Sequence, residues 1–176
     1  MPNPSNESQR LRALQALRVV GSTAEPVFDS VVSLLAQVTN TPIALISLVT
    51  EDQQWFKAKV DLPQVRSTAR DISFCTHAIE GRGIMVVSDA SRDNRFSSNP
   101  LVTESPGIRF YAGASLVTSD GYALGTLCAI DRVPRTLTTE QLTMLRQLAI
   151  VVTALIEARS DKVQLSEARA ALALMH

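Results

Sequence analysis

Apolar residues recur at helical spacing in three stretches of the chain. The stretch Ser5–Val20 carries one apolar stripe, made of Leu11, Leu14, Leu17 and Val20. Such a stripe predicts an amphipathic helix. A second helix is predicted over Glu25–Val38, because its apolar residues cover a wide face. A third is predicted to run from Thr138, which forms a capping box with Gln141, as far as His176.

Other stretches have patterns typical of strands. Ile43–Thr50 is apolar almost throughout and rich in β-branched residues, which predicts a central strand covered on both faces. Gln54–Val60 alternates, so we expect a hairpin strand with one solvated face. Further strands are predicted at Ile84–Ser88, Arg109–Val117 and Ala123–Ile130.

Two connecting segments differ from the rest. A short helix is expected around Ser73–Glu80, capped by Asp71 or Ser73. Asp89–Gly107 is polar and irregular, and a segment of this length without a long element is often functional. Because strands mostly follow strands, the fold class is α+β with an antiparallel sheet.

Composition narrows the class of protein. Of the 176 residues 45% are hydrophobic and 19% are charged, which suits a globular domain with a sizeable core. The 17 basic residues balance the 17 acidic ones, so there is no overall positive field to hold nucleic acid. The pattern contains neither a secretory signal nor an apolar run of the roughly 20 residues that span a bilayer. We therefore expect a cytoplasmic protein that binds neither nucleic acid nor membrane.

Several short motifs follow one another in a fixed order. They are Trp55-Phe56-Lys57, Asp71–Ile79, Val87–Ala90, Asp93–Phe96, Asn99–Val102, Ile108–Ala114 and Gly125–Asp131. In this order, and over roughly Glu25–Ile156, they resemble the GAF domain, in particular the bacterial subgroup found in diguanylate cyclases and sensor histidine kinases.

The resemblance implies a fold and a role. It implies about six antiparallel strands, with the terminal helices packed on one face and a small-molecule pocket on the other, roofed by Asp71–Glu80 and Asp89–Gly107. The chain then divides into an N-terminal helical extension (1–24), the GAF domain (25–157) and a C-terminal helical linker (158–176). The expected function is non-catalytic: a sensory domain that binds a small cytoplasmic ligand and signals through its flanking helices to an output domain of the diguanylate cyclase or histidine kinase type.

The candidate ligand-binding residues lie in the pocket-forming segments. Arg95, Phe96, Arg109 and Tyr111 combine guanidinium groups with aromatic faces, which suits a carboxylate, a phosphate or a flat ring. The same segments add Phe74, Cys75, His77 and Asp89 to the predicted site. Alternatively, Arg109 pairs with Asp89 or Glu104, His77 makes a structural hydrogen bond, and Asp89 and Asp93 cap turns. The sequence identifies neither the ligand nor a cofactor.

The cysteines and histidines offer little catalytic machinery. Cys75 and Cys128 stand 53 positions apart in apolar sequence, so we interpret them as packing residues. Cys75 and His77 diverge on a helix and cannot share a metal ion.

Two alternatives to the sensory function remain. One is a dimerisation or protein-interaction module whose pocket is filled by Trp55, Phe74, Phe96, Phe110 and Tyr111. The other, more distant, is a thiol-dependent redox enzyme.

The last predicted helix is longer than the domain. Residues 138–176 would reach about 58 Å as one helix, whereas a domain of this size is about 40 Å across. Beyond Ile156 the apolar set narrows to Val163, Leu165, Ala168, Leu172 and Met175. A narrow stripe of this kind requires a partner helix. We therefore expect a homodimer held by the two terminal helices, and a chain cut from a longer signalling protein.

Overall fold

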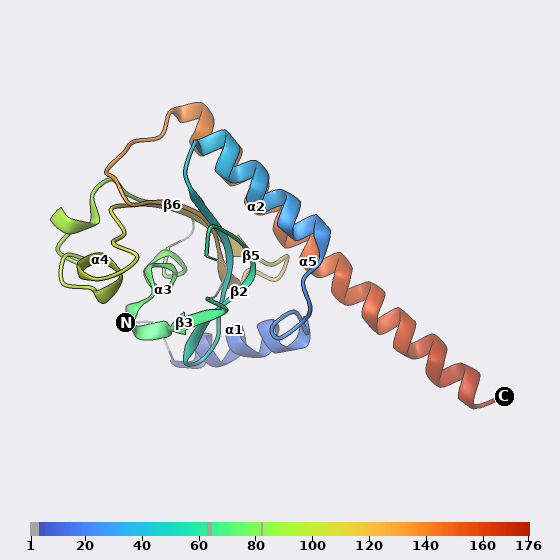
Figure 1. The fold of residues 1–176 in the computed structure, drawn as a ribbon. Helices are drawn as coiled ribbons and strands as arrows, with labels where there is room; N and C mark the ends of the chain where they lie inside the picture. The colour runs from blue at the N-terminus through green and yellow to red at the C-terminus, as the bar shows by residue number, and fades with distance from the viewer. Residues whose placement is uncertain (1–3, 63–64, 82) are drawn as a thin grey trace.

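The computed structural model describes residues 4–62, 65–81 and 83–176, and a six-stranded sheet lies at its centre (Figure 1). The strand order is β3-β2-β1-β6-β5-β4, and every neighbouring pair is antiparallel. The strands are β1 (Ile43–Val49), β2 (Gln53–Val60), β3 (Ser67–Ala69), β4 (Ile84–Val87), β5 (Phe110–Val117) and β6 (Ala123–Asp131). The predicted α+β class is confirmed; β3 is a strand that the sequence pattern missed.

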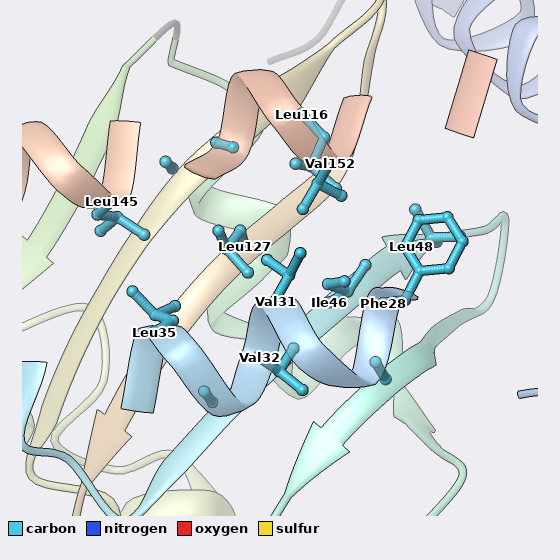
Figure 2. Close-up of a cluster of buried hydrophobic side chains, with 14 of the residues drawn as sticks. Phe28, Val31, Val32, Leu35, Ile46, Leu48, Leu116, Leu127, Leu145 and Val152 are labelled. Carbon is cyan, nitrogen blue, oxygen red and sulfur yellow. The ribbon is translucent and has the colours of Figure 1, made fainter. Parts of the chain in front are cut away.

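Long helices cover one face of the sheet. Figure 1 shows α2 (Pro26–Thr39) and the first half of α5 (Thr139–Leu174) packed side by side, with α1 (Pro4–Ala16) near one end of the sheet. Figure 2 shows the resulting cluster, in which Val31, Leu35 and Val152 from the helices meet Ile46 and Leu127 from the strands. Each fully buried aliphatic side chain of this kind stabilises the fold by about 1.5–3 kcal/mol. We call this the helix-side core.

Short elements cover the opposite face. They are η1 (Arg70–Ile72), α3 (Phe74–Ala78), η2 (Ala90–Arg92) and α4 (Pro100–Thr103). The Ser73 hydroxyl caps α3 by accepting from the Thr76 N–H at 3.2 Å, so Ser73 rather than Asp71 is the cap. Beneath these elements lies a second buried cluster, which we call the loop-side core.

The prediction that β2 has one solvated face is wrong. Lys57 is buried, and its amine donates to the Thr23 carbonyl at 2.7 Å and pairs with Glu25 at 2.5 Å. The register of β2 against β1 also shifts beside Ser47, which breaks the simple alternation of faces. A charged residue on a strand therefore faces the helices because a carboxylate from the start of α2 neutralises it.

The first helix ends earlier than its apolar stripe predicts. α1 stops at Ala16, and Arg18 takes a left-handed conformation with φ 53°. The turn still places Val19 in the helix-side core, together with Leu14. The stripe thus marks buried positions correctly but not the helical backbone that carries all of them.

α5 begins as predicted and extends beyond the domain. Thr138 and Gln141 form the capping box, and the Gln141 amide donates to the Val38 carbonyl at the end of α2. By length and composition alone α5 could cross a membrane, but its buried apolar residues pack in the helix-side core. Its last buried residue is Ser160; beyond that point Leu165 and Leu172 are 53% and 61% exposed.

Candidate functional site

An aromatic stack fills the region beneath Asp89–Gly107. The Phe74 ring on α3 stacks on Phe96 with centroids 4.0 Å apart and on Tyr111 with centroids 5.3 Å apart. The exposed His77 ring meets the edge of Phe96 at 5.0 Å. All three stacked rings are buried. Side chains therefore occupy the place where the family resemblance implies a ligand pocket.

A cluster of hydroxyl and thiol groups adjoins the stack, and we call it the thiol cluster. The Thr126 hydroxyl on β6 donates to the Cys75 sulfur at 2.9 Å. The Tyr111 hydroxyl lies 3.2 Å from the same sulfur and 3.3 Å from the Thr126 hydroxyl. Cys128 belongs to the same buried cluster as Cys75, and the Ser47 hydroxyl is buried without a hydrogen-bond partner among the described residues. The cluster thus gathers two thiols and three hydroxyls out of contact with water.

The electrostatics of the thiol cluster favour charge on Cys75. Burial by itself raises the pKa of a thiol. At Cys75 hydrogen bonds outweigh burial, chiefly from Cys128 and then from Thr126 and Tyr111, and they lower the pKa from 9.0 to about 6. The pKa of Cys128 is raised, first because it donates to Cys75 and then because it is buried. The two thiols therefore differ in surroundings: the Thr126 and Tyr111 hydroxyls are directed at the Cys75 sulfur.

Gly113 makes room for the Tyr111 side chain. Tyr111 and Gly113 lie two positions apart on β5 and so share a face of the sheet. A Cβ atom on Gly113 would come within 2.3 Å of the Tyr111 hydroxyl oxygen. Gly113 also pairs with Cys128 on β6. The phenol thus reaches the thiol cluster by lying across a position without a side chain.

The segment Asp89–Gly107, which we call the roof segment, is held in place by hydrogen bonds of its own polar residues. The Asp89 carboxylate accepts from the Ser91 N–H at 3.1 Å and caps η2, and Asp93 accepts from the Arg95 N–H at 2.9 Å. The Arg95 side chain pairs with Asp93 at 2.8 Å and lies over the Phe96 ring. Arg109 donates to the Val102 and Ile108 carbonyls at 2.9 and 3.0 Å. These contacts confirm that Asp89 and Asp93 cap turns.

The structure corrects the predicted arrangement of the site. The prediction that Arg95, Arg109 and Tyr111 face a common cavity under the roof segment is wrong. Arg95 is on the surface, Arg109 is bonded to backbone carbonyls, and Tyr111 is enclosed in packed side chains. Trp55 and Phe110, expected among the pocket-filling aromatics, instead belong to the helix-side core. Whether any of the predicted residues binds a ligand stays a prediction.

The cysteines also depart from the sequence interpretation. Both are buried, as packing residues would be. Their separation of 53 positions argues against a cluster, yet the antiparallel pairing of β5 with β6 and the placement of α3 bring both into one buried cluster. Alternation along β6 could have placed Cys128 on the loop side, but no local signal places α3 above it.

An open cleft of about 560 Å³ lies elsewhere, between α1, α3 and the β5–β6 turn. Its walls include Glu7, Arg10, Arg70, Thr76 and Tyr122. The Glu7 carboxylate accepts from Arg10 at 3.0 Å and from Arg70 at 2.6 Å. These hydrogen bonds, from Arg10 first, lower the pKa of Glu7 from 4.5 to about 2. Sequence reasoning missed this cleft because its residues are far apart in the chain.

Comparison with known proteins places the fold. The family model of the GAF domain matches residues 23–156. The chain is 42% identical over 156 residues to a cyclic di-GMP phosphodiesterase of Pseudomonas aeruginosa, covering 88% of this chain but 26% of that protein. It thus spans about a quarter of that relative, whose activity belongs to the whole protein.

Solved structures share the fold at low sequence identity. The GAF domain of an Acinetobacter phosphoenolpyruvate-protein phosphotransferase superimposes with a TM-score of 0.64 at 17% identity, covering 93% of this chain and 98% of that one. A free methionine-R-sulfoxide reductase from Neisseria meningitidis gives 0.62 at 15% identity, covering 93% and 96%. Because these likenesses extend to proteins of different function, they show the fold alone. Together with the sequence match over 23–156, they show that the chain belongs to the GAF domain family.

Proposed function

We propose that the chain is a non-catalytic regulatory domain that works as a homodimer and controls an output domain through α5. The observation that carries this proposal is the unpartnered apolar stripe at the end of α5. Leu165, Ala168, Leu172 and Met175 follow a 3-4-3 spacing and are exposed. A stripe with this spacing packs against a second helix in a coiled coil.

The neighbouring part of α1 supports the same proposal. Arg18, just beyond α1, pairs with Glu167 on the distal part of α5 at 2.5 Å, and Arg159 donates to the Arg18 carbonyl at 3.2 Å. Arg18, at the start of the α1–α2 connection, thus contacts α5 on both sides of Ser160. Movement of either terminal helix would change the surface that a second copy meets.

The output is proposed by analogy with the relative. That relative is a cyclic di-GMP phosphodiesterase, and it matches this chain along most of the chain's length. A GAF domain of this kind is expected to act on a phosphodiesterase or kinase-type output domain in the cytoplasm. The ligand that provides the input is a small molecule, for which the open cleft offers a volume of about 560 Å³.

Light scattering tests the dimer. We expect the intact chain to be a dimer at tens of micromolar, and a version ending at Ser160 to be a monomer. The double variant Leu165→Asp with Leu172→Asp should also be monomeric, because it places charge in the stripe. The control, Ser166→Asp with Ala173→Asp, adds the same charge beside the stripe and should stay dimeric. A monomeric intact chain would refute this part of the proposal.

A chimera tests the regulatory role. This chain would replace the matching region of the Pseudomonas relative, and hydrolysis of cyclic di-GMP would be measured. Deleting residues 161–162 rotates the rest of α5 by about 200° and should change the rate. Deleting seven residues, 161–167, nearly restores the helical phase and should largely recover it. Equal rates in all three chimeras would exclude signalling through α5.

A second function is favoured by the stacked rings of Phe74 and Phe96. If they never separate, the domain is an interaction module with a filled pocket. A thermal-shift screen of metabolites distinguishes a ligand-binding domain from an interaction module, because ligand binding raises the melting temperature. A hit that is lost in Arg10→Ala but kept in Arg109→Ala places the ligand in the open cleft. The reverse places it under the roof segment, and a screen without hits favours the interaction module.

A further inference from the structure

The thiol cluster holds more hydrogen-bond donors than packing requires. Side chains from β1, β5, β6 and α3 converge there, and Cys75, Tyr111, Thr126 and Cys128 are each at most 1% exposed. Small hydrophobic cysteines are common in cores. Here the Cys75 sulfur instead receives the Thr126 hydroxyl at 2.9 Å and has the Tyr111 hydroxyl at 3.2 Å. Hydrogen bonds directed at one sulfur stabilise its deprotonated form.

We propose that Cys75 and Cys128 form a redox-sensitive pair that a hydroperoxide converts to a disulfide. In the first step the Cys75 thiolate attacks the O–O bond of ROOH. Cys75 sulfenic acid forms, and ROH leaves after taking up one proton. In the second step the Cys128 sulfur attacks the sulfenic sulfur and releases water, so the Cys75–Cys128 bond forms. The two thiols lose two electrons in total, and these reduce the peroxide.

The surroundings of the two thiols indicate which one reacts first with the hydroperoxide. Cys75 accepts hydrogen bonds and is the better nucleophile, because the thiolate is the reactive form. Cys128, which shares the buried cluster with Cys75, then supplies the sulfur that attacks the sulfenic acid. Thr126 and Tyr111 are positioning residues: they hold the Cys75 sulfur as an acceptor and exchange no electrons.

Access to Cys75 runs through the open cleft. Cys75 points inward from α3, whereas Thr76 and Ile79 on the other side of the same segment line the cleft. α3 has five residues and is capped by Ser73. A five-residue helix can open locally at lower free energy than long helices and central strands, which open only together. A small hydroperoxide therefore reaches the sulfur when α3 opens, and a disulfide to β6 would then fix α3 in place.

The chemistry is a property of this chain alone, whereas its link to signalling rests on the proposed function. The reduced chain would be treated with hydrogen peroxide or tert-butyl hydroperoxide, denatured, alkylated and weighed by intact mass spectrometry. We expect loss of two hydrogens and no free thiol. Cys128→Ser should accumulate sulfenic acid that dimedone captures, and Cys75→Ser should not react at the same rate.

Thr126→Val tests the positioning role while keeping both thiols. Loss of a hydrogen bond to a charged acceptor should slow disulfide formation at pH 7 by roughly tenfold and move its pH profile upward. Circular dichroism and melting curves would show that each variant is folded. The proposal is overturned if both thiols stay reduced, if Cys75→Ser reacts like the native chain, or if the pH profile of Thr126→Val does not move. None of these readouts depends on the dimer or on the chimera, so either proposal can fail alone.

Discussion

The two faces of the sheet share the same strands but have different cores. On the helix side, long helices bury a nearly continuous set of aliphatic side chains such as Leu35 and Leu127. On the loop side, one-turn helices and irregular segments cover stacked aromatic rings and the thiol cluster. Alternate residues of one strand therefore meet different surroundings: aliphatic side chains of long helices on one face, and aromatic rings, thiols and hydroxyls on the other.

This difference indicates where the molecule can change without unfolding. The helix-side core distributes its stability over long elements that must open together. The loop-side core is closed by α3, α4 and their flanking turns, which are short and depend on individual caps such as Ser73 and Asn99. Local opening is expected on the loop side first, which is where the redox chemistry is proposed; the open cleft proposed for the input borders this side at Thr76 and Ile79.

The largest effect is expected from a cavity in the helix-side core. Leu35→Ala removes a fully buried side chain of α2 and should lower the free energy of unfolding by about 2–5 kcal/mol. Leu34→Ala, at the neighbouring position that is 46% exposed, should change it by less than about 1 kcal/mol. Urea denaturation measures both. Equal losses would mean that burial in this core does not govern stability.

A smaller effect is expected on the loop side from Gly113→Ala. The added Cβ would displace the Tyr111 hydroxyl, because the two atoms would lie 2.3 Å apart. Overpacking of this kind destabilises by about 1–3 kcal/mol, and the change should also remove one hydrogen bond from the thiol cluster. Gly83→Ala is the control, since a Cβ at Gly83 meets no atom within 4 Å. If both variants melt like the native chain, Tyr111 has room to move.

The smallest effect is expected at the border between the two regions, where Glu7 ties α1 to Arg70. The pKa of Glu7 is lowered from 4.5 to about 2 in the folded chain, so its carboxylate stabilises the fold above about pH 4.5. That contribution is lost as the pH falls from 4.5 towards 2. Glu7→Gln should flatten this part of the stability–pH curve, and Glu104→Gln, in an exposed position, should not. Parallel curves for the native chain and Glu7→Gln would show that the ion pair contributes nothing.

The fold was more predictable than the site because it depends on periodic patterns. Alternation and β-branched runs located five strands, and the Thr138–Gln141 capping box located the start of α5. β3 (Ser67–Ala69) was missed because a strand of three residues is too short to show an alternation of apolar and polar positions. Lys57 was misplaced because its burial depends on Glu25, 32 positions away.

The site depends on contacts between distant residues. Asp89 and Asp93 were predicted to cap turns, since such hydrogen bonds are local. Cys75 and Cys128 share a buried cluster because α3 packs on β6, and the spacing of residues along the sequence does not reveal this packing. The open cleft joins residues near positions 7, 70 and 122, so only the tertiary structure can show it.

The link between Gln141 and Val38 has a mechanical consequence for α5. It joins the start of α5 to the end of α2, so the long helix is anchored at one end and buried contacts guide it as far as Ser160. The part beyond Ser160, up to Leu174, extends about 21 Å at 1.5 Å per residue. A tilt of about 10° at the edge of the domain would move its tip by about 4 Å over that length. α5 thus acts as a rigid arm that pivots in the helix-side core. A small change in packing there displaces the far end of the helix by about the width of a side chain.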